Sequence, residues 1–129
     1  MKGKLYGIGI GPGDPELLTL KAVRLIREAD VIAVPGKVKT ETVAYQITVQ
    51  AVPEIAEKEC LEVYYPMSKD PEVLERCHTE AAMQIEAVLK EGKNVAFLTL
   101  GDTSVYSTYL YVHTKIMEMG YEAEIVSGI

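Results

Sequence analysis

This chain of 129 residues has few of the residue types that mark metal centres, disulfide scaffolds or nucleic-acid interfaces. It holds two cysteines and two histidines, and Cys60 and Cys77 lack C-x-x-C spacing. We therefore expect two free, partly buried thiols, and neither His78 nor His113 belongs to a metal-ligand pattern. The formal net charge of -6, with no Lys/Arg cluster, argues against nucleic-acid binding because phosphate contacts need a basic surface.

Long hydrophobic runs are missing too. No apolar segment approaches the roughly 20 residues needed to span a bilayer, and the N-terminus has no signal-peptide core with a cleavage site. We therefore expect a cytoplasmic protein without a membrane partner. The chain is 48% hydrophobic and 25% charged, which is enough apolar material for the core of one domain.

Apolar segments of strand length alternate with segments of helical period along the chain, a pattern typical of a parallel α/β sheet. The predicted strands lie at about residues 4–10, 31–34, 61–65, 94–100 and 122–126. A crossover helix follows the first loop. Its predicted apolar face consists of Leu17, Leu18, Leu20, Val23, Leu25, Ile26 and Ala29.

Capping residues predict the other helices. A weaker helix runs over residues 40–52 and ends before Pro53. The clearest helix has Asp70 as its N-cap and Pro71 at its first position, and it ends at Gly92. Its predicted apolar face consists of Leu74, Cys77, Ala81, Ile85, Val88 and Leu89. The last helix follows Asp102, ends at Gly120 and packs through Val105, Tyr109, Val112 and Ile116.

Two predicted strands end in loops that contain glycine and aspartate, Gly11-Pro12-Gly13-Asp14-Pro15 and Gly101-Asp102. Ligands of open parallel sheets bind at the carboxyl ends of strands, so these loops are the candidate site. The first loop does not match G-x-G-x-x-G, because Pro12, Asp14 or Glu16 falls at the third glycine. Asp30 stands before its strand, at the wrong end for a ribose-binding acid. A Rossmann dinucleotide site is therefore not expected.

A family resemblance rests on these same segments. Residues 7–22, GIGIGPGDPELLTLKA, followed by Ala29-Asp30-Val31, resemble the opening of the tetrapyrrole (corrin/porphyrin) methylases, which use S-adenosylmethionine. YPMSKD at 65–70 and AFLTLGD at 96–102 are similar to the branch that methylates C20 of precorrin-2 or cobalt-factor II in cobalamin biosynthesis. The resemblance implies an S-adenosylmethionine-dependent C-methyltransferase. Its fold would be a three-layer α/β domain with a mainly parallel five-stranded sheet of order 3-2-4-1-5.

The resemblance also implies the site residues. The cofactor contacts carried over by position are Pro12, Leu100, Gly101, Asp102 and Val105. Tyr106, Ser107 and Thr108 would line the trough for the macrocycle. Simpler roles stay open: Asp102 as a helix N-cap, Pro12 as a rigid turn, and Tyr106 as a core residue.

No catalytic residue is assigned and no metal site is expected. Methyl transfer from a sulfonium needs orientation and exclusion of water more than it needs an acid–base set. Related methylases carry an acidic residue just after the second strand, where this chain has Pro35 and Gly36. The likeness of Tyr106-Ser107-Thr108 favours a cobalt-containing substrate.

Other functions stay open. One is a related S-adenosylmethionine-dependent enzyme acting on another corrin position, diphthamide or ribosomal RNA, and another is a non-catalytic ligand-binding or interaction domain. The family resemblance also implies a homodimer. Because the sequence stops at Ile129, just after a predicted strand, we expect residues 1–129 to be an N-terminal domain, inactive without a second α/β domain. A natural terminus at that point is the alternative.

Overall fold

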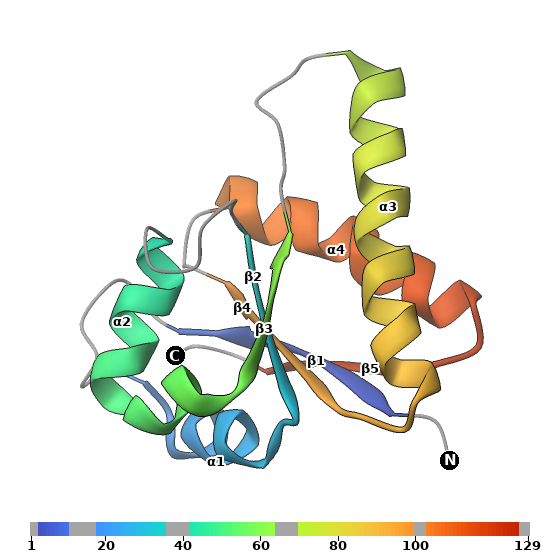
Figure 1. Ribbon diagram of the computed structural model, residues 1–129. Coiled ribbons are helices and arrows are strands. Elements are labelled where there is room, and N and C mark those ends of the chain that lie inside the picture. Colours follow the sequence, from blue (N-terminus) through green and yellow to red (C-terminus); the bar gives the residue numbers. More distant parts are fainter. Residues whose placement is uncertain (1–2, 11–17, 36–41, 64–69, 100–102, 127–129) are drawn as a thin grey trace.

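The computed structural model describes residues 3–10, 18–35, 42–63, 70–99 and 103–126, and it centres on one parallel sheet (Figure 1). The strands are β1 (Lys4–Gly9), β2 (Val31–Pro35), β3 (Glu59–Val63), β4 (Val95–Thr99) and β5 (Glu122–Val126). Their order is β3-β2-β4-β1-β5, and every pair of neighbours is parallel. The predicted α/β class and strand order are confirmed.

Helices cover both faces of the sheet. The elements α1 (Leu20–Glu28), α2 (Val43–Ala51) and the 3-10 helix η3 (Pro53–Glu57) pack on one face. The opposite face is covered by α3 (Pro71–Lys90) and α4 (Thr103–Glu118). Connections from β1 to β3 step toward one edge of the sheet and later ones step back. Because such crossovers are right-handed, the two directions place their helices on opposite faces.

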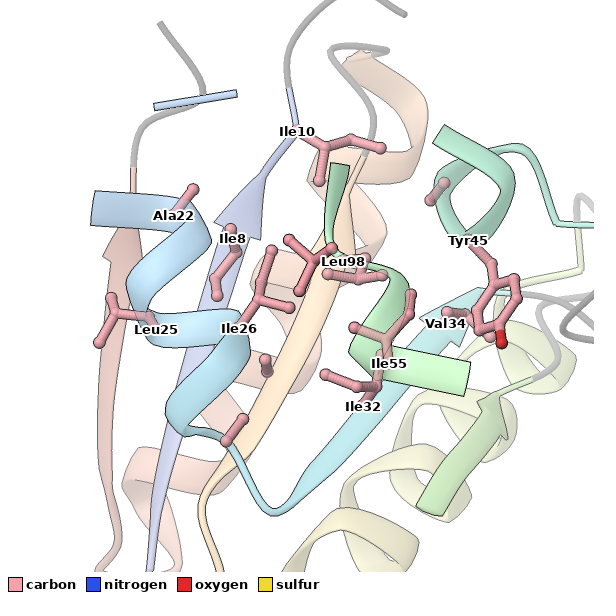
Figure 2. Close-up of a cluster of buried hydrophobic side chains, with 14 of the residues drawn as sticks. Ile8, Ile10, Ala22, Leu25, Ile26, Ile32, Val34, Tyr45, Ile55 and Leu98 are labelled. Atoms are coloured by element: carbon pink, nitrogen blue, oxygen red, sulfur yellow. The ribbon is translucent and has the colours of Figure 1, made fainter. Parts of the chain in front are cut away.

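The core on the α1 face is built by alternation along the strands, as Figure 2 shows. Ile32 and Val34 of β2 point to this face, and Ile26 of α1 packs against the same cluster. Leu20 was expected on the apolar face of this helix, but its side chain is 89% exposed. Thr19 caps α1 by accepting a hydrogen bond from Ala22 N (3.0 Å), so the helix starts at Leu20. At about 100° per residue, Leu20 then lies opposite the buried stripe.

The third strand and the second helix differ most from their predicted boundaries. The third strand begins at Glu59 instead of residue 61, because its pairing with β2 sets Val31 opposite Glu59. The helix predicted over 40–52 spans Val43–Ala51, and η3, which was not predicted, follows it and buries Ile55.

The caps of α3 are as predicted. The Asp70 side chain accepts a hydrogen bond from Glu72 N (3.0 Å), and Pro71 occupies the first turn. Gly92 and Gly120 both have positive φ angles, 87° and 93°, which glycine adopts without strain where a helix ends. The apolar stripes of α3 and α4 are confirmed by the burial of Ala81, Ile85, Leu89, Tyr109, Val112 and Ile116. The side chain of Val105 lies outside the described residues.

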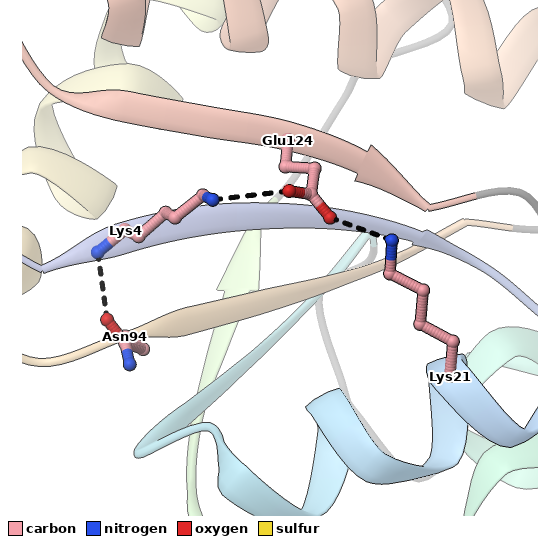
Figure 3. Close-up of polar contacts among 4 residues, drawn as sticks. All are labelled: Lys4, Lys21, Asn94 and Glu124. Carbon is pink, nitrogen blue, oxygen red and sulfur yellow. Dashed lines mark hydrogen bonds and ion pairs between the residues drawn. The ribbon is translucent and has the colours of Figure 1, made fainter.

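Polar contacts hold the amino-terminal part of the sheet (Figure 3). The Asn94 side chain accepts from Lys4 N (2.9 Å), and Asp30 Oδ2 accepts from Asn94 N (2.9 Å). Asp30 therefore serves the end of the sheet opposite to the candidate site, as expected. Glu124 pairs with both Lys4 and Lys21 at 3.2 Å, and these contacts lower the pKa of its carboxyl group.

The remaining sequence expectations concern thiols and membranes. Cys60 and Cys77 are reduced thiols and partly buried, as predicted. Among the helices that the structure describes, none has the length and apolar character of a membrane span.

Candidate functional site

The carboxyl end of β4 lies between those of β1 and β2, because β4 pairs in parallel with both strands. From β4 the chain continues to α4, whereas from β1 and β2 it continues to α1 and α2 on the opposite face. Open α/β sheets form their ligand crevices where neighbouring connections diverge in this way. We call the carboxyl ends of these strands, with Ile10, Val34, Leu98 and Thr99, the switch-point edge.

Thr99 joins two strands at the switch-point edge. Its carbonyl oxygen accepts a hydrogen bond from Ile10 N (3.0 Å), and its hydroxyl donates to the carbonyl oxygen of Ile8 (3.2 Å). The Thr99 side chain is 1% exposed. The ends of β1 and β4 are therefore hydrogen-bonded at the point where the chain leaves toward opposite faces.

The floor of the switch-point edge is apolar. Ile10, Val34 and Leu98 are fully buried, and all three belong to the core under α1 and α2. Ala44 and Tyr45 of α2 belong to the same cluster. The switch-point edge therefore lies directly above the hydrophobic core of this face of the sheet.

Four of the eight predicted site residues come shortly after these strand ends in the chain. Pro12 comes two positions after Ile10, and Leu100, Gly101 and Asp102 come directly after Thr99. These four predicted cofactor contacts lie outside the described residues. The structure brings together the residues that precede them, since Ile10 and Thr99 are hydrogen-bonded.

The other predicted contacts lie at the start of α4. Val105, Tyr106, Ser107 and Thr108 belong to the first turns of a helix that begins at Thr103, and their side chains lie outside the described residues. Because α4 follows β4 directly, these turns begin near the switch-point edge.

Among the described residues, three titratable groups with lowered pKa values lie on α3 and α4. Burial lowers the pKa of His78 on α3 and of His113 on α4. The Lys115 ammonium, 2.6 Å from Glu75, lowers the pKa of that carboxyl group. Within the described ranges, no group of three or more His, Cys, Asp or Glu could hold a metal ion.

Sequence reasoning missed Thr99 as a site residue. It treated this threonine only as part of a strand, although a hydroxyl residue that ends a fully apolar strand was visible in Val95–Thr99. It also missed the packing of Tyr109 on Gly7, where a Cβ would lie 2.2 Å from the tyrosine ring. That contact joins residues far apart in the chain, and no local pattern indicates it.

Comparison with known proteins adds to this geometry. Residues 4–129 match the family of Tetrapyrrole (Corrin/Porphyrin) Methylases. The chain is 42% identical over 127 residues to a "Probable cobalt-precorrin-2 C(20)-methyltransferase" of Methanocaldococcus jannaschii, covering 98% of this chain and 53% of that protein. It is 34% identical over 117 residues to the cobalt-precorrin-2 C(20)-methyltransferase of Salmonella typhimurium, covering 90% of this chain and 48% of that one.

A solved structure agrees with the fold. The crystal structure of uroporphyrin-III-C-methyltransferase from Thermus thermophilus superposes with a TM-score of 0.63 at 28% identity, covering 100% of this chain and 49% of that one. The chain thus spans about half the length of the curated relatives that it matches.

Proposed function

Because this chain belongs to the tetrapyrrole (corrin/porphyrin) methylases, we propose that it is part of an S-adenosylmethionine-dependent C-methyltransferase of cobalamin biosynthesis. The proposed reaction is methylation of C20 of precorrin-2 or cobalt-factor II. The observation that carries this proposal is the similarity along the whole chain to proteins named for that reaction. The candidate site supports it, because β1 and β4, the strands that precede the two expected cofactor segments in the chain, pair in parallel.

The residues at the switch-point edge suit S-adenosylmethionine. Ile10, Val34 and Leu98 belong to the hydrophobic core beneath the proposed site, and the donor is proposed to bind above them. Pro12, Leu100, Gly101, Asp102 and Val105 are the residues proposed to hold the donor. A glycine at 101 permits close approach of backbone to ligand, and a carboxylate at 102 complements a cationic sulfonium.

When bound, the donor would supply a methyl group from its sulfonium sulfur. A nucleophilic carbon of the reduced tetrapyrrole would form a bond to this methyl group in line, and the neutral thioether S-adenosylhomocysteine would leave. This domain is proposed to contribute orientation, and the hydrogen bond between the ends of β1 and β4 supports this, because both proposed cofactor segments follow from these ends in the chain. It also contributes exclusion of water through the apolar floor. The proton lost from the methylated carbon passes to water or substrate. Tyr106, Ser107 and Thr108 are proposed to line the macrocycle trough.

We propose that a second α/β domain completes the cleft and that this chain alone is inactive. The support is the length relation, since the chain spans about half of its curated relatives. We further propose a cytoplasmic homodimer. Dimers with two-fold symmetry are the commonest oligomers of soluble proteins. Exposed apolar side chains such as Tyr111 and Met117 are compatible with a protein partner. Sedimentation of the complete gene product tests this: a single monomeric species at high concentration contradicts the dimer.

Calorimetric titration of S-adenosylhomocysteine into residues 1–129 and into the complete gene product tests the cofactor assignment. Binding only to the complete product supports a site shared between two domains. Binding to neither contradicts the assignment.

Turnover tests the reaction itself. The complete product, incubated with S-adenosylmethionine and either precorrin-2 or cobalt-factor II, should add one methyl group detectable by mass spectrometry. The cobalt-containing substrate is expected to react faster. Absence of turnover on every reduced tetrapyrrole, with the cofactor bound, contradicts the enzyme function and leaves a binding domain.

A further inference from the structure

Thr99 is one of few buried polar side chains in the described ranges, and its two contacts meet at a single place in the fold. Its hydroxyl donates to the carbonyl oxygen of Ile8 (3.2 Å), while its own carbonyl accepts from Ile10 N (3.0 Å). Both partners belong to the end of β1, and Thr99 is the last residue of β4. Thr99 therefore links β4 to β1 both through its side chain and through its main chain.

The hydroxyl bond is additional to the sheet. Parallel pairing already sets Gly9 opposite Thr99, so the ladder alone would join these strands. A valine would supply the same shape and β-branching, and the four residues of β4 before Thr99 are all apolar. The pairing of β1 with β4 therefore gives no reason for a hydroxyl at this position beyond the stability of one more hydrogen bond.

Rigidity at the strand ends does give such a reason. The chain leaves Ile10 toward Pro12 and leaves Thr99 toward Leu100, Gly101 and Asp102, which are the proposed contacts of the methyl donor. These two exits continue to helices on opposite faces of the sheet. A productive site must hold its groups to within about 0.5 Å, so a second bond between the two strand ends adds precision to their relative placement.

We propose that Thr99 is a positioning residue for the S-adenosylmethionine site, acting through its hydroxyl bond to Ile8 to keep the ends of β1 and β4 in fixed register. This inference rests on the proposed function. It deepens that function, because it assigns to a residue below the site the relative placement of the two cofactor segments.

Thr48 is a matched control. Its side chain is fully buried, and its hydroxyl donates to the carbonyl oxygen of Ala44 (2.7 Å) within α2. Thr48→Val thus removes a buried hydroxyl bond of the same kind, but one that joins no two strands. Both valine variants should lower the melting temperature, so a loss of ligand affinity confined to Thr99→Val separates positioning from general stability.

The test is calorimetric titration of S-adenosylhomocysteine into the complete gene product and its variants. Thr99→Val should raise the Kd by roughly fivefold to tenfold, about the effect of one buried hydrogen bond. Thr99→Ser keeps the hydroxyl and should bind within about twofold of the wild type. Thr48→Val should bind as the wild type does.

Two results overturn the inference while the wild type still binds: an unchanged Kd for Thr99→Val, or an equal loss for Thr48→Val. If the wild type itself does not bind, the proposed cofactor fails first and the inference fails with it, so the two failures are distinguishable. If Thr99→Val does not fold, Thr99→Cys and Thr48→Cys carry the same comparison, because a thiol is only a weak donor.

Discussion

The ring of Tyr109 on α4 lies directly against Gly7 of β1. A Cβ built on Gly7 would stand 2.2 Å from two ring carbons and 2.4 Å from the hydroxyl oxygen. Tyr109 is fully buried, its ring meets Phe97 of β4 at a centroid distance of 5.1 Å, and its hydroxyl lies 2.9 Å from His113 Nδ1. The absence of a side chain on Gly7 thus lets α4 approach the sheet closely.

Gly7→Ala should therefore destabilise the fold. The added methyl group cannot be accommodated without moving a buried ring, and such overpacking costs about 1–3 kcal/mol of unfolding free energy. Chemical denaturation of the wild type and the variant measures the change. Tyr109→Leu makes room at the same point, so in the double variant the cost of Gly7→Ala should shrink. Additive losses from the two substitutions would contradict the proposed clash.

Two roles of Asp102, as a helix N-cap and as a counter-charge to the sulfonium, can be distinguished by comparing a cationic with a neutral ligand. Asp102→Asn keeps an N-cap oxygen but removes the carboxylate that we propose faces the sulfonium. Affinity for cationic S-adenosylmethionine should then fall about fivefold more than affinity for neutral S-adenosylhomocysteine, since about 1 kcal/mol of attraction is lost. Calorimetry with both ligands measures the difference. Equal weakening of both would show that the side chain acts as a cap and not as a counter-charge.

Asn94 should matter for stability and not for ligand binding. Asn94→Ala removes the acceptor for Lys4 N at the amino-terminal part of the sheet, which should cost about 1 kcal/mol. The melting temperature should fall, while the Kd for S-adenosylhomocysteine stays at the wild-type value because the site is at the opposite edge. A substantial change in Kd would mean that loss of any sheet contact perturbs the site, and it would weaken the case for Thr99.

Stability should fall as the solution is acidified past neutrality. Burial lowers the pKa of His78 and of His113 below the ordinary value of 6.5, so the unfolded chain takes up protons before the folded one does. The unfolding free energy is therefore full above about pH 6.5 and declines below it, until the folded-state pKa values are passed. Denaturation curves between about pH 7.5 and pH 5 measure this dependence.

A variant assigns part of that decline to one residue. His78 stacks on Tyr111 with ring centroids 4.7 Å apart. Besides burial, which lowers the pKa of His78, the charge of Glu75 raises this pKa and the charge of Lys115 lowers it. His78→Phe keeps a ring for the stack and removes the titration, so its stability should decline less steeply with acid. A variant that declines as steeply as the wild type would exclude His78 as a source.

The sequence by itself determined the local elements of this protein. Apolar segments of strand length indicated the strands, and Asp70, Gly92 and Gly120 mark helix ends because capping depends on neighbours within a few residues. The strand order was available only through family resemblance. The predicted cofactor contacts at Pro12 and Leu100–Asp102 stay predictions, because they lie outside the described residues.

Tertiary structure decided what depends on contacts between distant segments. The start of β3 follows from its pairing with β2, and the exposure of Leu20 follows from where Thr19 begins the helix against the sheet. The contact of Tyr109 with Gly7 joins residues about a hundred positions apart, and the bond from Thr99 to Ile8 joins residues 91 positions apart. Periodicity indicates which face of a segment is buried, whereas only packing selects the partner on that face, and at Thr99 that partner is the neighbouring end of β1.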